Sequence, residues 1–572
     1  MENKYRVTAF ILVFLLFAAG LNVYSQDSRQ RTGGSPLAEN FPPGTYPSGS
    51  STGTARGDGA VAERYAQWAK DTIEKGQWKE GLAALERASD FADVSSDISY
   101  LLALARSHEN KPRGTILEAL KKALYVNSWN IYDAEAARLL MAEQLIVLRA
   151  YQEALHELSM VKKSPREAEL SLRALVTSLP EEFRRYMTHT LDRYPRECGP
   201  VRVFFDFLKN EDAAGRNPGK DDLELLELVI RRLPALLLKD PELAWIAAPF
   251  MRDSAEAKRL VSAYRAINKP LPSSLPAALR LGAIDEETAL EELFASSSLD
   301  KALVSELWDL LRREEAREYF RRNLLSFTGV ITEDADRDGF PEISVEYAGG
   351  MIKQYTYDAD QDGHPDLTVF FEAGDPRRAL TFVPPENSGP KNSGYESSRR
   401  EVSVRWERYP AVLEAELNGA RFVPRPFAFN YSPLEFAEMW GSGLLFPKRD
   451  ALSPPLTRRI LVMNALRILR PSLEFSGGTE VVELAQGIPI RAREYVLLPG
   501  STGDLLVSET EFVRGRPQLQ RLDLDLDGHI DTVRHFRRAY RTVELEELWD
   551  YDRNIDYTVK VSGEEWGKGN GE

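Results

Sequence analysis

The sequence has very few of the residues and motifs that would place a protein in a well-defined chemical class. Only one of its 572 residues is a cysteine, Cys198. No disulfide can therefore form within the chain, and no cysteine-based zinc site can be built. The sequence also has neither a glycine-rich phosphate loop nor a His-Glu-x-x-His zinc motif. These absences favour a protein that is not an enzyme and that is stabilised by packing or by ions with oxygen ligands.

Positive charge is also in short supply. The chain has 88 acidic residues against 73 Lys and Arg, which gives a formal net charge of -15. Because this charge would repel a phosphate backbone, nucleic acid is not expected as a partner. Hydrophobic residues make up 43% of the chain, which is enough to fill the roughly two to four domains expected at this length.

The N-terminal segment is typical of a protein made for export. Lys4 and Arg6 precede an apolar run at 7–21, and residues 23–25 complete the pattern of a secretory signal peptide cleaved after Ser25. An uncleaved membrane anchor is the alternative, but about 15 apolar residues fall short of the ~20 that span a bilayer as a helix. No cysteine lies near the cleavage point, which argues against a lipid anchor. The mature chain is expected in a periplasm or outside the cell, with no integral membrane segment.

Changes of composition divide the rest of the chain. After the signal peptide at 1–25, residues 26–60 are rich in Gly, Ser, Pro and Thr, which predicts a flexible linker. Residues 61–325 place apolar side chains at helical spacing. Residues 326–572 carry short runs rich in β-branched and aromatic residues. The sequence therefore predicts an α+β multidomain protein, with a helical domain followed by an antiparallel β-rich domain.

The helical region contains a degenerate repeat. Its copies share an aromatic or apolar residue and small residues at steps of three and four, and they start 35 and 38 residues apart. The repeated positions are Trp78, Gly81, Leu85 and Ala88; Ile116, Leu120 and Ala123; and Tyr151, Ala154, Leu158 and Val161. Small side chains at such positions let two helices cross closely. The pattern resembles the tetratricopeptide repeat (TPR), which implies an α-solenoid that binds a protein partner.

The TPR-like pattern covers roughly 62–165, and an ordinary helical bundle is the alternative. Further helices are expected at 221–238 and 300–325 without a fit to the repeat. In the β-rich region, strands are expected at 342–347, 366–371, 402–408 and 411–417, with a helix near 456–469. Strands so close in sequence favour hairpins in an antiparallel meander over a parallel sheet.

Three loops in the β-rich region share one acidic formula. They are Asp334-x-Asp336-x-Asp338-Gly339-x-x-Glu342, Asp358-x-Asp360-x-Asp362-Gly363-x-x-Asp366 and Asp523-x-Asp525-x-Asp527-Gly528-x-x-Asp531. Alternate residues of a tight loop can point their carboxylates at one hard cation, and the glycine permits the positive φ that reverses the chain. The formula predicts Ca²⁺ sites. The alternative is that Asp-Gly sequences simply form turns with solvated acids. Residues 550–556 contain a degenerate fourth copy without the glycine.

The loops are not EF-hands, because position 12 is Val345, Val369 or Arg534 in place of a bidentate Glu. Since a strand is expected after the ninth residue, they resemble instead the calcium-binding β-hairpin loops of integrin α-subunits and related FG-GAP repeats. The resemblance covers these loops alone and implies three ligand sets. They are Asp334, Asp336, Asp338, the carbonyl of Phe340 and Glu342; Asp358, Asp360, Asp362, the carbonyl of His364 and Asp366; and Asp523, Asp525, Asp527, the carbonyl of His529 and Asp531.

Three functions are compatible with these patterns. The leading hypothesis is an exported scaffold that binds a protein through the helical repeats and has a calcium-stabilised β domain. A carbohydrate- or ligand-binding protein is the second, and it would require exposed aromatic residues such as Trp406, Tyr409 and Trp440 on one face of the sheet. A cell-envelope hydrolase is the third, and it would require two carboxylates in one cleft.

Overall fold

The structure, a computed structural model, describes most of the chain from residue 56 onward. The described residues are 56–90, 95–213, 215–216, 218–268, 271–336, 338–383, 400–472, 475–497, 503–536, 543–549 and 555–559. The predicted signal peptide and all but the last residues of the predicted linker lie outside them. Residues 56–60, which we assigned to the linker, instead begin the first described helix. Most of the predicted fourth acidic copy at 550–556 is also outside the described residues.

The first half of the described chain is helical, as predicted. Its α-helices are α2 (Arg56–Glu74), α3 (Trp78–Ser89), α4 (Ser96–His108), α5 (Arg113–Val126), α6 (Ala134–Val147), α7 (Tyr151–Ser159), α8 (Pro165–Ser178), α9 (Pro180–Arg193), α10 (Cys198–Ala213), α11 (Lys220–Leu236), α12 (Leu243–Ile246), α13 (Ser254–Ile267), α14 (Leu275–Arg280), α15 (Glu286–Phe294), α16 (Lys301–Leu310) and α17 (Glu314–Leu325). Side-chain caps begin many of them, because the first N–H groups of a helix have no partner within it. Ser95, Asp133 and Ser164 cap α4, α6 and α8 in this way.

The helices at the start of this half form antiparallel hairpins. Helices α2 and α3, α4 and α5, and α6 and α7 pack as successive pairs. The small repeat residues lie where these helices cross: Ala69 and Ala88 are fully buried, and a Cβ added at Gly81 would lie 2.5 Å from Ile73 Cγ1. This arrangement is the TPR-like α-solenoid that the repeat predicts. The helices continue beyond it around a separate cluster of buried residues that contains Phe183, Phe204 and Phe207. The single helix predicted at 300–325 is wrong in detail, since it is divided into α16 and α17.

The second half forms one long antiparallel sheet. Its strands are β2 (Gly329–Glu333), β3 (Ile343–Ala348), β4 (Met351–Tyr357), β5 (Leu367–Glu372), β6 (Asp375–Val383), β7 (Arg400–Arg408), β8 (Ala411–Leu417), β9 (Ala420–Pro424), β12 (Ala465–Pro471), β13 (Thr479–Ala485), β14 (Ile488–Leu497), β15 (Asp504–Val513), β16 (Arg516–Leu522), β17 (Thr532–Phe536), β18 (Val543–Trp549) and β19 (Ile555–Val559). Each of these strands pairs with the next, and β9 pairs with β12, so the predicted meander is confirmed. A short strand that the sequence did not predict, β1 (Ser298–Asp300), extends from the helical half and pairs in parallel with β2.

A hairpin and a short helix lie between β9 and β12. The hairpin consists of β10 (Leu434–Glu438) and β11 (Leu445–Arg449). The helix predicted near 456–469 is shorter than expected, because α18 spans Arg458–Asn464 and the chain then enters β12. The hairpin covers the part of the sheet formed by β2 to β9, which we call the near part. There the Tyr347 hydroxyl donates a hydrogen bond to the Leu445 carbonyl at 2.9 Å.

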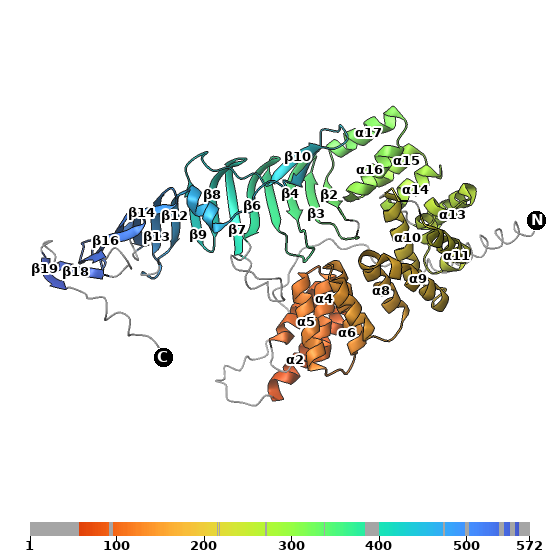
Figure 1. The fold of residues 1–572 in the computed structure, drawn as a ribbon, viewed down its shortest axis with the longest axis horizontal. Helices are drawn as coiled ribbons and strands as arrows, with labels where there is room; N and C mark the ends of the chain where they lie inside the picture. The colour runs from red at the N-terminus through yellow and green to blue at the C-terminus, as the bar shows by residue number, and fades with distance from the viewer. Residues whose placement is uncertain are drawn as a thin grey trace, which may run out of the picture.

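One hydrophobic core joins the two halves of the chain. It contains Leu307 and Phe320 from the helical half together with Tyr355 of β4 and Phe446 of β11. The molecule is elongated, with the sheet running from α17 toward β19 and with α4, α5 and α6 lying beside one edge of its near part (Figure 1). No helix among the described residues has both the length and the apolar character needed to cross a bilayer.

The three acidic loops lie on the same side of the sheet, at the ends of its strands. In a meander, successive connections alternate between the two ends of the strands. The loops follow β2, β4 and β16, so an odd number of other connections lies between each loop and the next. We call them loop 1 (Asp334–Glu342), loop 2 (Asp358–Asp366) and loop 3 (Asp523–Asp531). The fold thus brings three copies of one formula to one side of the sheet.

Candidate metal-binding loops

The three loops have the same internal hydrogen bonds. The glycine N–H donates to the first aspartate of its loop, and the N–H of the second residue donates to the ninth-position acid. These bonds are Gly339 to Asp334 (2.8 Å), Gly363 to Asp358 (2.9 Å) and Gly528 to Asp523 (2.8 Å), and Ala335 to Glu342 (2.8 Å), Ala359 to Asp366 (2.9 Å) and Leu524 to Asp531 (2.6 Å). The acids therefore fold each loop onto itself.

The glycine conformation explains why position 6 is the same in each loop. Gly339, Gly363 and Gly528 have φ values of 96°, 85° and 93°, which residues with a Cβ adopt only at a cost. The fourth residue is also left-handed in loops 2 and 3, at Gln361 and Leu526, and the fourth residue of loop 1 lies outside the described residues. Leu524 and Leu526 alternate with the acids of loop 3 as they would in a strand, but Leu526 has the same left-handed conformation as Gln361 of loop 2.

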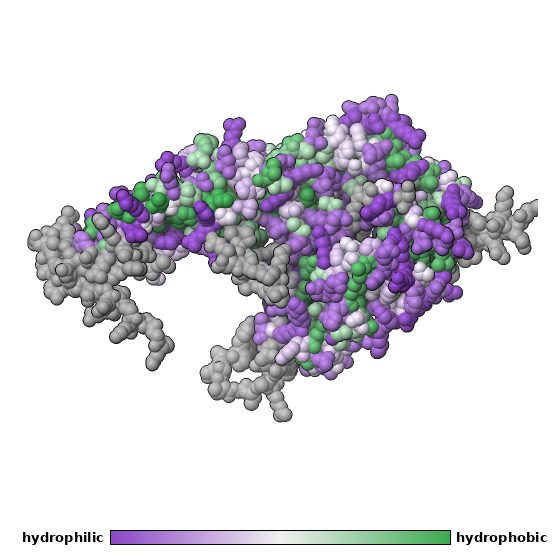
Figure 2. Space-filling model, in the orientation of Figure 1, coloured by the Kyte–Doolittle hydropathy of each residue, from purple (hydrophilic) through white to green (hydrophobic). Residues whose placement is uncertain are grey.

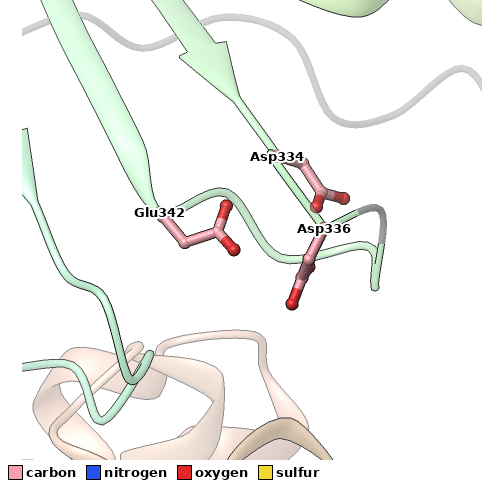
Figure 3. A group of neighbouring side chains, drawn as sticks. All are labelled: Asp334, Asp336 and Glu342. Carbon is pink, nitrogen blue, oxygen red and sulfur yellow. The ribbon is translucent and has the colours of Figure 1, made fainter. Parts of the chain in front are cut away.

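Each loop brings three of its predicted ligands together. The first, third and ninth acids of each loop place one oxygen each within 4.8 Å of one another. These groups are Asp334, Asp336 and Glu342; Asp358, Asp360 and Asp366; and Asp523, Asp525 and Asp531. Figure 3 shows the first group at the ends of β2 and β3. Oxygen ligands at such separations suit a hard cation such as Ca²⁺.

The remaining predicted ligands are engaged in other contacts. The fifth-position acids accept hydrogen bonds from the N–H of the seventh residue, at 2.9 Å from Phe340, 2.8 Å from His364 and 2.8 Å from His529. These acids are Asp338, Asp362 and Asp527. In loop 1, the Phe340 carbonyl that was predicted as a ligand accepts a hydrogen bond from Gln361 Nε2 at 2.9 Å.

Burial and neighbouring carboxylates both affect the pKa values of the loop acids. Burial, with a smaller contribution from Asp362, Asp360 and Asp366, raises the pKa of Asp358 to about 7 against the hydrogen bond from Gly363. Burial also raises the pKa of Asp338 and of Asp523. In loop 2, Asp358 Oδ1 is buried without a hydrogen-bond partner. A cation at the centre of a loop would stabilise the charged form of these acids.

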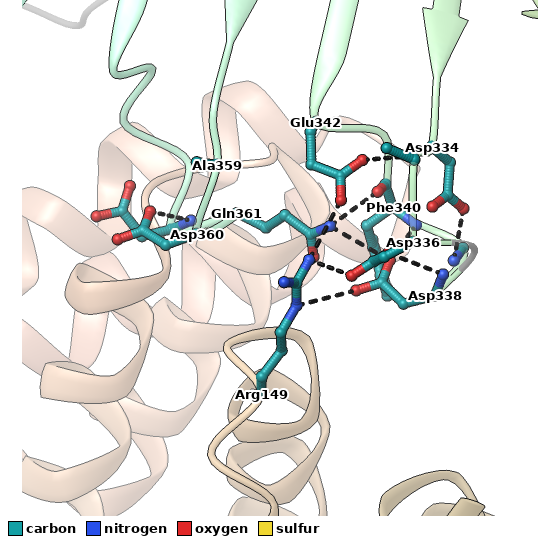
Figure 4. Close-up of polar contacts among 12 residues, drawn as sticks. Arg149, Asp334, Asp336, Asp338, Phe340, Glu342, Ala359, Asp360 and Gln361 are labelled. Carbon is teal, nitrogen blue, oxygen red and sulfur yellow. Dashed lines mark hydrogen bonds and ion pairs between the residues drawn. The ribbon is translucent and has the colours of Figure 1, made fainter. Parts of the chain in front are cut away.

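Loop 1 already contains a positive charge from the helical half. Arg149 follows α6 with a φ of 59°, and its guanidinium forms ion pairs with Asp336 and with Glu342, the latter at 3.2 Å. Its Nε lies 4.0 Å from Asp338 Oδ2. Figure 4 shows the guanidinium reaching into loop 1 from below, beside the amide of Gln361. Sequence reasoning missed Arg149, because it lies far from the loop in the sequence and no motif connects the two.

Loop 2 also contacts the helical half, but through backbone. The Arg113 N–H, at the start of α5, donates to the Asp362 carbonyl at 2.6 Å. A Cβ added at Gly363 would lie 3.0 Å from Pro112 Cα. The Arg113 guanidinium lies 5.4 Å from the Phe340 ring centroid, and its Nη1 donates to Gln144. Burial lowers the pKa of Arg113, and the charges of Glu143, Asp358 and Asp338 partly offset this effect.

Loop 3 joins β16 to β17 in the part of the sheet formed by β13 to β17, which we call the far part and which lies away from α5 and α6 (Figure 1). Leu524 is 52% exposed, and the nearest atom to a Cβ added at Gly528 is a carbon of Leu505, 3.8 Å away on the same sheet. The first aspartate, Asp523, is buried and accepts hydrogen bonds from the Leu526, Asp527 and Gly528 N–H groups. Loop 3 therefore has the same backbone as loops 1 and 2 but a different environment.

The aromatic residues considered for ligand binding belong to the core. Trp406 is 3% exposed, its indole N–H donates to the Tyr431 carbonyl, and its ring meets Tyr409 edge to face. Tyr409 donates to the Leu434 carbonyl. Trp440 packs against Phe320 of α17. These three side chains fix the β10–β11 hairpin to the sheet and do not form an exposed aromatic platform.

Comparisons with known proteins identify only distant relatives. No family model matches the chain. An uncharacterized protein of Treponema pallidum (strain Nichols) is 22% identical over 611 residues, covering 87% of this chain and 75% of that protein.

Similar solved structures include proteins built from helical repeats. A tetratricopeptide repeat protein from Parabacteroides merdae is 11% identical, covers 46% of this chain and 99% of its own, and has a TM-score of 0.31. PilF of Pseudomonas aeruginosa is 15% identical with 46% and 98% coverage and a TM-score of 0.26. MamA of Desulfovibrio magneticus is 16% identical with 32% and 97% coverage and a TM-score of 0.26. Likenesses at this level carry no argument about function. The functional argument rests on the chain's own architecture, a TPR-like α-solenoid followed by an antiparallel β-rich domain.

Proposed function

We propose that the protein is an exported scaffold that binds a protein partner through its helical repeats and whose β-rich domain is stabilised by Ca²⁺ in the acidic loops. The single observation that carries the proposal is that one loop geometry occurs three times at the same ends of the strands. Three copies of the same hydrogen-bond pattern place carboxylates around a common centre each time. The three alternating aspartates also accept backbone N–H groups of the turn, so the calcium proposal is supported by the convergence of the first, third and ninth acids.

Calcium is the cation that the loops suit best. Ca²⁺ takes six to eight oxygen ligands in flexible geometry, whereas Mg²⁺ requires a nearly ideal octahedron. Export would expose the loops to the calcium concentrations at which extracellular modules bind, with dissociation constants on the order of 10⁻⁴ to 10⁻³ M. The signal-peptide pattern at residues 1–25 supports this location.

The helical half supports the scaffold part of the proposal. A solenoid of helical hairpins forms an extended surface, since each repeat contacts mainly its neighbours. Two large side chains of this region are prominently exposed, Tyr125 at the end of α5 and Ile131 before α6. The carbohydrate-binding alternative loses its main support, because Trp406, Tyr409 and Trp440 are held in the core.

Thermal unfolding of the mature chain tests the calcium part. A ligand at about 100 times its dissociation constant stabilises the folded state by about 2.7 kcal/mol. The melting temperature should therefore be higher in millimolar Ca²⁺ than in EDTA. A variant with Asp336→Ala, Asp360→Ala and Asp525→Ala should lose this response.

A matched variant controls for the loss of negative charge. It carries Glu181→Ala, Glu224→Ala and Glu372→Ala, which remove three exposed carboxylates outside the loops. This control should keep the full calcium response. If the wild-type chain melts at the same temperature in EDTA and in Ca²⁺, the loops are solvated turns and the calcium proposal is wrong.

A further inference from the structure

In loop 1, an arginine from the helical half forms direct ion pairs with the loop acids. The Arg149 guanidinium pairs with Asp336 and Glu342, two of the three acids whose oxygens converge in loop 1. Its Nη2 makes both contacts, with Asp336 Oδ2 and with Glu342 Oε1. Both oxygens therefore face a nitrogen that carries part of a positive charge.

The guanidinium and a metal ion require the same oxygens. The second oxygen of Glu342 already accepts the Ala335 N–H, so Oε1 is the one available to a cation. The Phe340 carbonyl and Asp338 Oδ1 both accept hydrogen bonds from Gln361 Nε2, at 2.9 Å and 3.3 Å. Two residues outside loop 1, Arg149 and Gln361, therefore contact four of the five groups predicted as calcium ligands, and the fifth, Asp334, accepts the Gly339 N–H. A calcium ion could enter only if these donors withdrew.

We propose that Arg149 is the resident cation of loop 1, and that Ca²⁺ and the helical repeats compete for this loop. This inference rests on the proposed calcium chemistry of the loops. It assigns the three loops two roles: loops 2 and 3 bind Ca²⁺ directly, whereas loop 1 binds either Arg149 or Ca²⁺. Because coupling between two ligands is reciprocal, calcium in loop 1 weakens the contact of Arg149 with the sheet by the factor by which Arg149 weakens calcium binding.

Loop 2 contacts the helical half in a different way. It accepts a backbone hydrogen bond from Arg113 at the Asp362 carbonyl, and the Arg113 guanidinium, which donates to Gln144, acts on Asp358 through its charge. Asp358 Oδ1 is buried there without a partner. Loop 2 can therefore take a cation while the helical repeats remain in contact with the sheet.

Counting bound calcium tests the inference. Equilibrium dialysis of the full mature chain with radioactive Ca²⁺ should give two sites of similar affinity and a third that is weaker. In Arg149→Gln, the third site should bind about 5- to 150-fold more tightly, which is the usual range of coupling between sites. Arg149→Lys keeps a positive charge and should change the third site much less. Arg202→Gln is the matched control, since Arg202 also pairs with two acids, Asp240 and Glu242, and both of these lie within the helical half.

The possible outcomes separate this inference from the proposed function. If loops 2 and 3 bind Ca²⁺ and the third site has the same affinity in the wild type and Arg149→Gln, the competition is absent while the calcium function stands. If no variant and no wild-type chain binds Ca²⁺, both proposals are wrong. Adding Asp336→Ala to Arg149→Gln should abolish the third site, which identifies it as loop 1.

A second measurement requires no substitution. Hydrogen–deuterium exchange of the wild-type chain should be faster in Ca²⁺ than in EDTA at residues 147–151, because calcium displaces the turn that carries Arg149. Residues 177–183, at the turn between α8 and α9, should exchange equally in both conditions and serve as the internal control. Equal or slower exchange at 147–151 in Ca²⁺ would overturn the competition, whatever the behaviour of the variants.

Discussion

Loops 1 and 3 share a sequence formula and a backbone, but their surroundings are very different. In both, the glycine N–H bonds to the first aspartate and the ninth acid accepts from the second residue. Loop 1 receives Arg149 from the helical half, whereas loop 3 has an exposed leucine and, next to Gly528, the Leu505 side chain of its own sheet. The comparison shows that spacing determines the shape of such a loop, while the rest of the fold determines what fills it.

The same contrast extends to the sheet as a whole. Its near part, β2 to β9, is covered by helices and by the β10–β11 hairpin, and it buries large side chains such as Tyr347 and Tyr355. Its far part, β13 to β17, exposes apolar residues including Ile490 and Val513. In Figure 2, hydrophobic and hydrophilic residues alternate on the surface of this part. Stability should therefore be unevenly distributed along one continuous sheet.

The largest difference in unfolding free energy is expected between two alanine variants, one that truncates a buried side chain in the near part and one that truncates an exposed side chain in the far part. Phe446, on β11, is 1% exposed and lies under Lys301 Nζ, 4.3 Å from the ring centroid. Phe446→Ala should cost about 3–5 kcal/mol of unfolding free energy, because it leaves a cavity in the core. Leu506→Ala, in the far part, should cost less than ~1 kcal/mol, since Leu506 is already 40% exposed.

Urea denaturation followed by far-ultraviolet circular dichroism measures both effects as shifts of the unfolding midpoint. The comparison between the near and far parts fails if the two substitutions shift the midpoint equally. Phe446→Leu provides a control, because it keeps most of the apolar volume and should lose much less stability than the alanine variant.

A smaller difference should appear among the three loop glycines. Alanine at Gly339, Gly363 or Gly528 has to adopt a positive φ, which costs about 1–3 kcal/mol at each position. Only at Gly363 would the new methyl group also lie 3.0 Å from the backbone of another element, at Pro112 Cα. We therefore expect Gly363→Ala to be the most destabilising of the three by a further ~1 kcal/mol or more.

Melting temperatures of the three alanine variants in EDTA measure this difference without a contribution from calcium. Equal losses at all three positions would show that loop 2 does not contact the helical half. A smaller loss at Gly363 would contradict the close approach of Pro112.

The glycines also illustrate what the sequence could predict. Their recurrence at position 6 of an acidic loop indicated a positive φ, and all three have one. The step of three and four residues between Trp78, Gly81 and Leu85 likewise predicted helical hairpins, because small residues allow close crossing. Such features depend on residues near one another in the chain, so a local pattern is sufficient to reveal them.

Features that join distant segments were missed. Arg149 meets Glu342 across 193 positions, and β1 joins the sheet from within a helical region. No local pattern marks an arginine after α6 as a partner of an acidic loop, since an exposed arginine there is equally compatible with solvent. The extent of the solenoid beyond 165 was also unpredictable, because its packing depends on a cluster of phenylalanines from several helices without a repeat spacing.

The smallest effect should come from a charge ladder in the far part of the sheet. Arg493 on β14 pairs with Glu509 on β15 at 3.0 Å and approaches Glu483 on β13 at 3.8 Å, and Arg521 on β16 pairs with Glu509 from the other side. Arg493→Gln should cost less than about 1 kcal/mol, because exposed ion pairs gain little over water. The difference between this variant and the wild type should decrease further in 1 M NaCl, where the screening length is about 3 Å. Urea midpoints at low and high salt measure both values. A loss above ~2 kcal/mol that persists at high salt would mean that the far part is as well covered as the near part, and that the contrast between the two parts of the sheet is wrong.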